Sequence, residues 1–440
     1  MRPNIRSQRL ALGLAASVCW FAPEPSRGDT VDASSTTMLI VRDQVRGGTS
    51  YTIAPLYEIL SVSARDIRNP FAESLSVVFS GWGAGAIGDH LVWFDRDRPT
   101  NRVFGDLDLA YLQGEILKRH LQLRLGRQLV GGGVTGALQL DGANVLVRLP
   151  YGLGVSAYVG SPVSQRFDER GTEATFNPQR GNFATGGRAY FTLPAWGEVG
   201  ASGVLVQDHG DPSRRQVGAD LRLTPLRPLM VLANTSYDVY EERWAETNLV
   251  GQVQVLPKVL VIADYRHVEP DLLLARNSIL AVFAVDRRNE VGGAVRYGPW
   301  KAITLDVDYH YLKEEAGHGN RAGARATWRA AKDAVLGVEL TAQETTQNDY
   351  FGGRAFASKR VDRFTGTLDL QEYAFDQPVN GPGSGHKNSF LATGTLGYAL
   401  GHGLDALVSA SGGATPYYES RFDVMAKLAY NQSYHVREVR

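Results

Sequence analysis

The chain has 440 residues, of which 43% are hydrophobic, and equal numbers of basic and acidic side chains, with 46 Lys plus Arg and 46 Asp plus Glu. Its mean hydropathy is −0.20, and no run approaches eighteen consecutive apolar residues, so a helical membrane protein is excluded. The balanced charge gives no argument for nucleic acid as a partner. Composition alone does not separate a membrane β-barrel from a soluble β protein.

The first residues have the pattern of a secretory signal. Arg2, Arg6 and Arg9 precede the apolar run Leu10–Ala22, and a Pro-rich stretch follows. A basic start and an apolar core of about thirteen residues fit an export signal and are too short to span a bilayer. We therefore predict a signal peptide over residues 1–28. The single cysteine, Cys19, lies inside it, so its removal leaves a mature chain without thiols or disulfides.

From about residue 74 to residue 432 the sequence repeatedly alternates apolar and polar residues with period two. Leucines occupy every second position of Leu121–Leu125, and apolar or aromatic residues every second position of Ile303–Tyr311. Such alternation indicates β-strands with one apolar face. A soluble sandwich would show the same alternation, so the spacing of the turns has to decide between the two fold classes.

The connections between these predicted strands fall into two alternating classes. Longer polar loops are expected at 131–139, 162–182, 269–285, 313–319 and 346–387. Short turns at one end of a barrel and long loops at the other are typical of outer-membrane barrels, with the short end in the periplasm. The short connectors are Lys118–His120, Pro150–Gly152, Pro194–Trp196, Pro225–Arg227, Pro257, Pro299–Trp300, Ala331–Lys332 and Gly401–Gly403.

The sequence therefore predicts an all-β, transmembrane, antiparallel up-and-down β-barrel over residues 71–432, in the outer membrane of a bacterium. Counting strands between the turns gives about 18, and 16 to 20 remain possible. Within the expected loop 346–387, the segment Arg363–Leu370 alternates and is an alternative strand. Residues 29–70 are interpreted as an N-terminal periplasmic segment or an extra strand, and residues 433–440 as a C-terminal tail.

Assigning the apolar parity to lipid leaves charged residues for the pore interior. One interpretation is an electropositive strip that guides anionic solute or polymer. The other is that neighbouring strands pair these charges and stiffen the wall, for example Asp306 and Asp308 with Arg321 and Arg325. The predicted pore-lining residues are Arg124, Arg148, Arg188, Arg222, Arg266, Arg296, Arg321, Arg325, Arg329, Asp306 and Asp308.

Two charged residues, Arg127 and Asp141, have the lipid parity. Both lie near the loop end of adjacent predicted strands, in a register that places them opposite each other. A salt bridge in the interfacial rim explains the pair, with a β-bulge that turns it inward as an alternative.

Short motifs around this pair, and elsewhere, carry a resemblance. Gly126–Gln128 ends a strand, a glycine-rich loop follows, and Leu140–Ala143 opens the next strand. This arrangement is similar to the alginate-export type of outer-membrane barrel. The sequences PLYE at 55–58, SGWGAG at 80–85 and TPYYESRFDVMAKL at 415–428 resemble the polysaccharide-export barrels of myxobacteria. The resemblance implies an eighteen-stranded pore for polysaccharide, which works with periplasmic polysaccharide-export proteins and inner-membrane co-polymerase proteins.

The leading functional hypothesis is a channel that exports a cell-surface polysaccharide and performs no chemistry of its own. A diffusion porin for small anionic or sugar solutes is the alternative, and a structural or adhesive barrel with a blocked lumen is a third class. No catalytic, cofactor or metal site is expected. Asp306, Asp308 and His310 share one strand face, but such neighbours lie about 6.6–6.8 Å apart, too far to hold one metal together.

Overall fold

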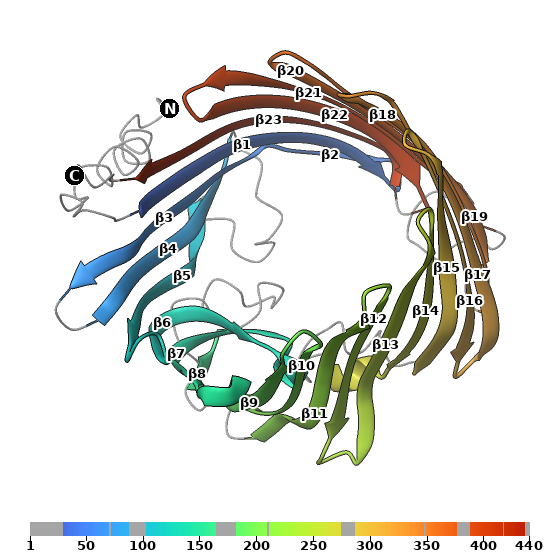
Figure 1. Cartoon of the computed structure of the whole chain (residues 1–440). Coiled ribbons are helices and arrows are strands. Elements are labelled where there is room, and N and C mark those ends of the chain that lie inside the picture. Colours follow the sequence, from blue (N-terminus) through green and yellow to red (C-terminus); the bar gives the residue numbers. More distant parts are fainter. Residues whose placement is uncertain are drawn as a thin grey trace, which may run out of the picture.

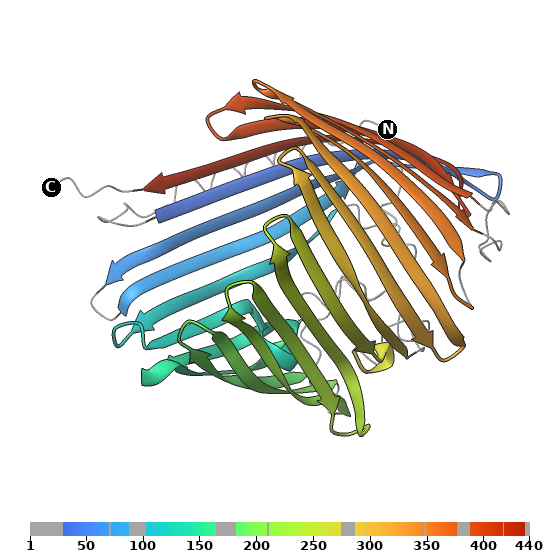
Figure 2. The same cartoon turned by 45° about the vertical axis from the view of Figure 1, so that its right-hand side comes forward.

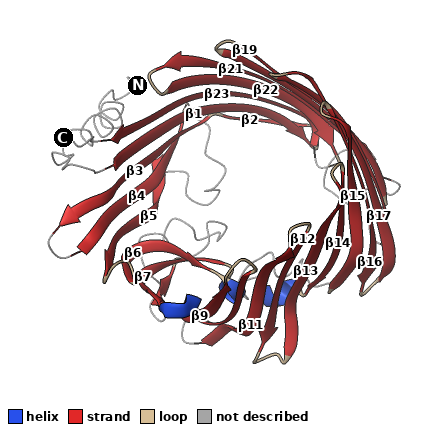
Figure 3. Cartoon of the chain, in the orientation of Figure 1, coloured by secondary structure: helices blue, strands red, loops and turns tan. Residues whose placement is uncertain are grey.

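The computed structural model describes residues 30–69, 72–87, 103–163, 182–208, 211–273, 287–346, 349–375, 388–416 and 418–435. Almost all of them are β-strand, and the strands surround a central lumen (Figure 1). The predicted signal peptide and much of the predicted long loops lie outside the described residues. Figure 3 shows that, among the residues described, helix is confined to single turns, which are η1 (Gly133–Thr135), η2 (Pro150–Gly152) and α3 (Pro270–Leu273).

The strands follow one another around the wall in chain order. Their bounds are β1 Thr30–Arg46, β2 Thr49–Ile53, β3 Pro55–Asn69, β4 Ala72–Ala86, β5 Val103–Ile116, β6 Leu121–Gly131, β7 Ala137–Arg148, β8 Leu153–Pro162, β9 Phe183–Leu193, β10 Gly197–Asp208, β11 Asp211–Leu226 and β12 Leu229–Asp238. The others are β13 Arg243–Leu256, β14 Val259–Val268, β15 Arg288–Trp300, β16 Ile303–Glu314, β17 Gly317–Ala331, β18 Ala334–Glu344, β19 Tyr350–Val361, β20 Phe364–Phe375, β21 Asn388–Gly401, β22 Leu404–Thr415 and β23 Tyr418–His435.

The barrel closes between its first and last strands. β1 pairs with β23 from Thr30 opposite His435 to Val45 opposite Ser420. On its other side β1 pairs with β2 and then with β3, which are one strand interrupted at Ala54. The 23 labelled strands therefore form a closed antiparallel barrel of 22 strands. The predicted number of about 18 is wrong, and so is the range of 16 to 20.

The four missing strands have two origins. Residues 29–70 contribute β1 and the β2/β3 strand, so this region is barrel wall and not a periplasmic segment. The expected loop 346–387 contains β19 and β20, which pair along their whole length. The alternating segment Arg363–Leu370 is therefore strand from Phe364 onward. At the other end of the chain, β23 runs to His435 and enters the predicted tail.

The two ends of the barrel differ in the length of their connectors. At the end that holds Thr30 and His435, the ten connectors are two to four residues long, and all eight predicted short turns are there. At the opposite end the connectors range from two residues (Gly47–Gly48) to the twenty residues of 163–182. Figure 2 shows the strands running obliquely between these ends. In outer-membrane barrels the short-turn end is periplasmic.

The predicted facing of the strands explains why large apolar side chains are exposed on the outer surface of the barrel. Large apolar side chains of one parity are exposed around the outside, including Val307 at 57% and Leu396 at 56%. A soluble protein buries such a belt, whereas a barrel in lipid does not need to. A closed barrel also leaves no unpaired sheet edge in the hydrocarbon. The chain is therefore a β-barrel of the bacterial outer membrane.

Candidate functional site: the lumen wall

All eleven predicted pore-lining residues have the parity opposite to the apolar belt. On β15 to β17, for example, the outward side chains are Val295, Val307 and Trp328, and the charged residues alternate with them. The structure separates these charged residues into two groups, which differ in how much contact their side chains make.

On the wall from β15 to β20, charged residues stand directly opposite one another across four strand pairs, and a glutamine continues the row across the fifth. The register is Arg296, Asp306, Arg325, Glu339, Arg354 and Gln371, one residue from each strand. We call this set the charge row. Positive and acidic groups alternate along it from Arg296 to Arg354. Opposite residues on one face lie within side-chain reach of each other, so these groups can form ion pairs.

Only some members of the charge row form ion pairs. Arg296 Nε lies 2.5 Å from Asp306 Oδ1, and Arg354 Nε donates to Asp369 Oδ2 at 2.9 Å. Arg325 faces Asp306 in the register, but its guanidinium lies over the Phe356 ring, 5.1 Å from the centroid.

The suggested pairing of Asp306 and Asp308 with Arg321 and Arg325 is therefore wrong. Arg321 pairs instead with Glu290, and Asp308 Oδ2 lies 3.5 Å from His310 Nδ1. Neighbouring strands of this wall do pair opposite charges, but with other partners than those suggested.

The arginines of the earlier strands are held more firmly. Arg188 donates to Asp220 through Nε at 3.0 Å and to Glu198 through Nη2 at 2.6 Å. Arg124 donates to Gln113 at 2.8 Å, and Arg148 to Gln122 at 3.1 Å. Three of the predicted pore-lining arginines on this side thus bind neighbouring side chains. Within the described part of the chain, no ion pair involves Arg222, Arg266, Arg325 or Arg329, and all four side chains are exposed.

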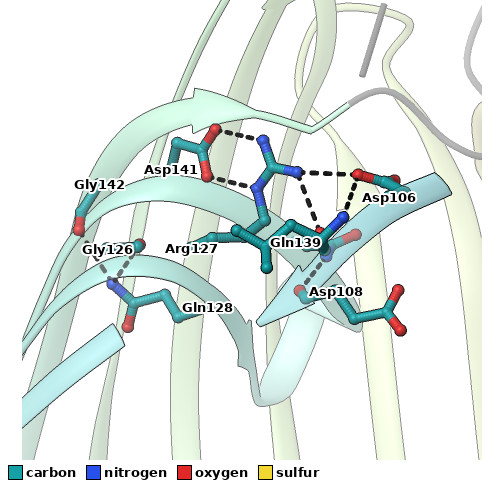
Figure 4. A network of polar contacts seen from close by, with 9 residues as sticks. Asp106, Asp108, Gly126, Arg127, Gln128, Gln139, Asp141 and Gly142 are labelled. Carbon is teal, nitrogen blue, oxygen red and sulfur yellow. Dashed lines mark hydrogen bonds and ion pairs between the residues drawn. The ribbon is translucent and has the colours of Figure 1, made fainter. Parts of the chain in front are cut away.

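Arg127 and Asp141 lie opposite each other and form a two-point ion pair (Figure 4). Arg127 Nε lies 2.7 Å from Asp141 Oδ1, and Nη2 lies 2.8 Å from Oδ2. Arg127 Nη1 also donates hydrogen bonds to a second acid, Asp106 of β5, at 3.2 Å and to the Leu107 carbonyl at 3.0 Å. We call this group the Arg127 clamp. The sequence did not indicate Asp106.

The clamp lies where two neighbouring strands part. β5 and β6 are paired only from Ala110 opposite Arg127 to Ile116 opposite Leu121, whereas β5 pairs with β4 as far as Val103. At the parting point Gly126 has φ +119°, and a Cβ there would collide with the Ala110 carbonyl. The side chains of Arg127 and Gln139, which donate to the Leu107 and Asp108 carbonyls, replace the missing backbone ladder.

Beyond the parting point the β6–β7 connector packs inside the barrel. Val134 N donates to Ser202 Oγ at 2.9 Å, and the Val134 carbonyl accepts from Arg214. Arg214 also donates to Gln216, whose amide donates to the Leu272 carbonyl of α3 at 3.0 Å. η1 and α3 therefore form one shelf on the inner wall of β8 to β13. Its small apolar core is Val130, Val134, Leu140, Tyr158 and Val204.

Aromatic rings on the interior parity form a feature that the sequence analysis missed. Each ring stands directly opposite a glycine on the next strand, and a Cβ on that glycine would collide with it. Two of these rings, Tyr190 and Phe356, also lie against arginines, with Arg188 at 5.0 Å and Arg354 at 5.3 Å from the centroids. The register would have revealed these pairs. They are Gly154 with Tyr190, Gly186 with Tyr158, Gly337 with Phe356 and Gly352 with Tyr373.

No family model matches the chain, and no curated protein is similar to it in sequence. Several solved structures share its fold. The siderophore receptor PirA from Pseudomonas aeruginosa has 12% identity and a TM-score of 0.56 over 93% of this chain and 81% of that chain. A mutant of the ferric enterobactin receptor PfeA from the same organism, in complex with enterobactin, has 10% identity and a TM-score of 0.55 over 93% and 82%. This chain therefore has the fold of large outer-membrane β-barrels.

Proposed function

We propose that this barrel is the outer-membrane channel through which an acidic cell-surface polysaccharide leaves the cell. The observation that carries the proposal is the set of interior arginines without an ion pair among the described residues, Arg222, Arg266, Arg325 and Arg329. Exposed guanidinium groups in a wet pore are donors for carboxylate or phosphate groups.

A polymer gains more binding free energy from a wall of exposed arginines than a small solute does. Each exposed ion pair contributes only about 0–1 kcal/mol, so one small anion is held weakly. A chain with many acidic groups meets several arginines at once, and the contacts reinforce one another. Because barrel diameter grows with strand number, a 22-stranded barrel is wider than porins with 16–18 strands.

The resemblance to polysaccharide-export barrels adds support from particular residues. In the motifs that carry the resemblance, Arg127 pairs with Asp141, and Gln128 donates to the Gly142 carbonyl (Figure 4). The barrel offers no energy source of its own, so the proposal includes periplasmic polysaccharide-export proteins and an inner-membrane co-polymerase as partners that drive the polymer.

Gene deletion followed by an assay of surface polysaccharide tests the proposal. We expect polymer to be lost from the surface, and restored by the wild-type gene. The variant R222Q/R266Q/R325Q/R329Q should fold and restore less surface polysaccharide than the wild-type gene does. A control variant removes as many charges from exposed positions outside the lumen face, K118Q/R215Q/K313Q/K359Q, and should restore export fully.

One outcome contradicts export, and a second contradicts the role of the interior arginines. Normal surface polysaccharide in the deletion strain, with impaired uptake of small anions or sugars, would identify a diffusion porin. Equal restoration by the two variants would show that the four interior arginines do not act on the polymer.

A further inference from the structure

Five consecutive connectors at the short-turn end each carry one exposed cation. They join β11 to β12, β13 to β14, β15 to β16, β17 to β18 and β19 to β20. Within the described residues, none of the five side chains forms an ion pair, and the one hydrogen bond is from Lys258 Nζ to the Pro299 carbonyl at 2.9 Å. The five cations are Arg227, Lys258, Lys301, Lys332 and Arg363.

Exposed apolar side chains accompany these cations. Trp300 (66% exposed) precedes Lys301, and Phe364 follows Arg363. Leu226, Leu256 and Trp328 are exposed on the other three hairpins. In outer-membrane barrels, aromatic side chains gather at the level of the lipid headgroups. The cations of the same turns therefore lie at that level too.

The opposite end of the same arc has the opposite charge. Its described connectors contain one cation, Arg287, against six acids, which are Glu241, Glu242, Glu269, Asp271, Glu315 and Asp349. At the short-turn end the five cations are accompanied by two acids in the same turns, Asp333 and Asp362. The excess of positive charge is thus specific to one rim of the barrel.

We propose that these five turns form a collar that binds the phosphate headgroups of glycerophospholipids in the periplasmic leaflet. The apolar neighbours enter the membrane while the cations meet the phosphates. The arrangement fits single headgroups better than an acidic protein. Successive turns on one end are two strand spacings apart, about 10 Å, so the cations form a line around the rim and not a compact patch.

The expected strength follows from surface electrostatics. A Lys or Arg at an anionic membrane surface contributes about 1 kcal/mol, which corresponds to about a fivefold preference for an anionic lipid at each site. The contact is also exposed, so salt should weaken it.

The experiment measures which lipids contact the folded barrel. The full chain is reconstituted in vesicles of phosphatidylglycerol and phosphatidylcholine, and the association of each spin-labelled lipid is measured by electron paramagnetic resonance. Wild type should prefer phosphatidylglycerol by up to about fivefold. The preference should vanish in R227Q/K258Q/K301Q/K332Q/R363Q and persist in K258R/K301R/K332R, which keeps every charge.

Several results would overturn the collar. If the neutral variant keeps the wild-type lipid preference, the proposal is wrong. A wild-type barrel without any lipid preference also contradicts it, including a barrel that instead binds an acidic periplasmic protein at this rim. Should the neutral variant fail to fold, the wild-type barrel supplies the test by itself. Its preference must fall between 0.1 M and 1 M NaCl, where the screening length shrinks from about 10 Å to about 3 Å, and a preference independent of salt contradicts the proposal.

Discussion

In the wall from β5 to β13, charged side chains hold folded structure together, whereas in the wall from β15 to β20 they line the lumen in register. Arg127, Arg188 and Arg214 each bind several groups in the first wall. Arg296 and Arg325 make one contact each in the second. The same residue type on the same barrel therefore serves two purposes, and burial distinguishes them.

The largest contrast is expected between Arg127→Ala and Arg296→Ala. The Arg127 side chain is 13% exposed, and its removal leaves the carboxylate of Asp106, which is 10% exposed, without its ion-pair partner. Removing one partner of a buried pair costs about 3–5 kcal/mol, whereas the Arg296 side chain is 56% exposed and an exposed pair contributes about 0–1 kcal/mol. Urea unfolding in lipid vesicles measures both. Equal losses in the free energy of unfolding would show that the Arg127 clamp contributes no more to stability than the charge row does.

The next contrast tests the facing of β20, which lies within the loop 346–387 expected from the sequence. Leu370 has the outward parity at the middle of β20, and Thr367 has the interior parity. Leu370→Arg should cost about 2–4 kcal/mol because it buries a charge in the hydrocarbon. Thr367→Arg should cost much less, since its side chain meets water. Similar costs in the same unfolding assay would mean that β20 is not part of the membrane wall.

A smaller effect is expected at the shelf. Gly133 has φ +56° and lies against Ser202, so Gly133→Val should displace η1. Overpacking of this kind costs about 1–3 kcal/mol, and displacement of the shelf should raise single-channel conductance in planar bilayers. Gly366→Val is the matched control, because nothing lies within 4 Å of a Cβ at that position. Unchanged conductance in a folded Gly133→Val barrel would show that the shelf does not narrow the pore.

Much of the fold follows from the sequence because its signals are local. Period two and the proline-containing turns predicted the facing of the strands and one end of the barrel. The strand number failed where local signals compete. β19 and β20 carry many interior polar residues, such as Arg354 and Asp369, and a polar stretch was interpreted as loop. The polar β1 similarly obscured the start of the barrel.

The site was predictable only across a single hairpin. Arg127 and Asp141 pair through the register of one turn, which the sequence contains. Asp106 comes from β5, whose pairing with β4 shifts register between Ser80 and Gly81, and alternation alone does not reveal that shift. Asp306 has an arginine on each side, Arg296 and Arg325, and the sequence does not choose between them.

The most direct test of the proposed function is the block of ionic current by an acidic oligosaccharide in planar bilayers at low salt. Oligogalacturonate should interrupt the current through wild type, and neutral dextran fragments of similar length should do so much less. The interruptions should shorten in R222Q/R266Q/R325Q/R329Q, because the exposed contacts that hold the polymer are gone. Equal block by acidic and neutral oligosaccharides, or the same block in the variant, would contradict an interior that recognises an acidic polymer.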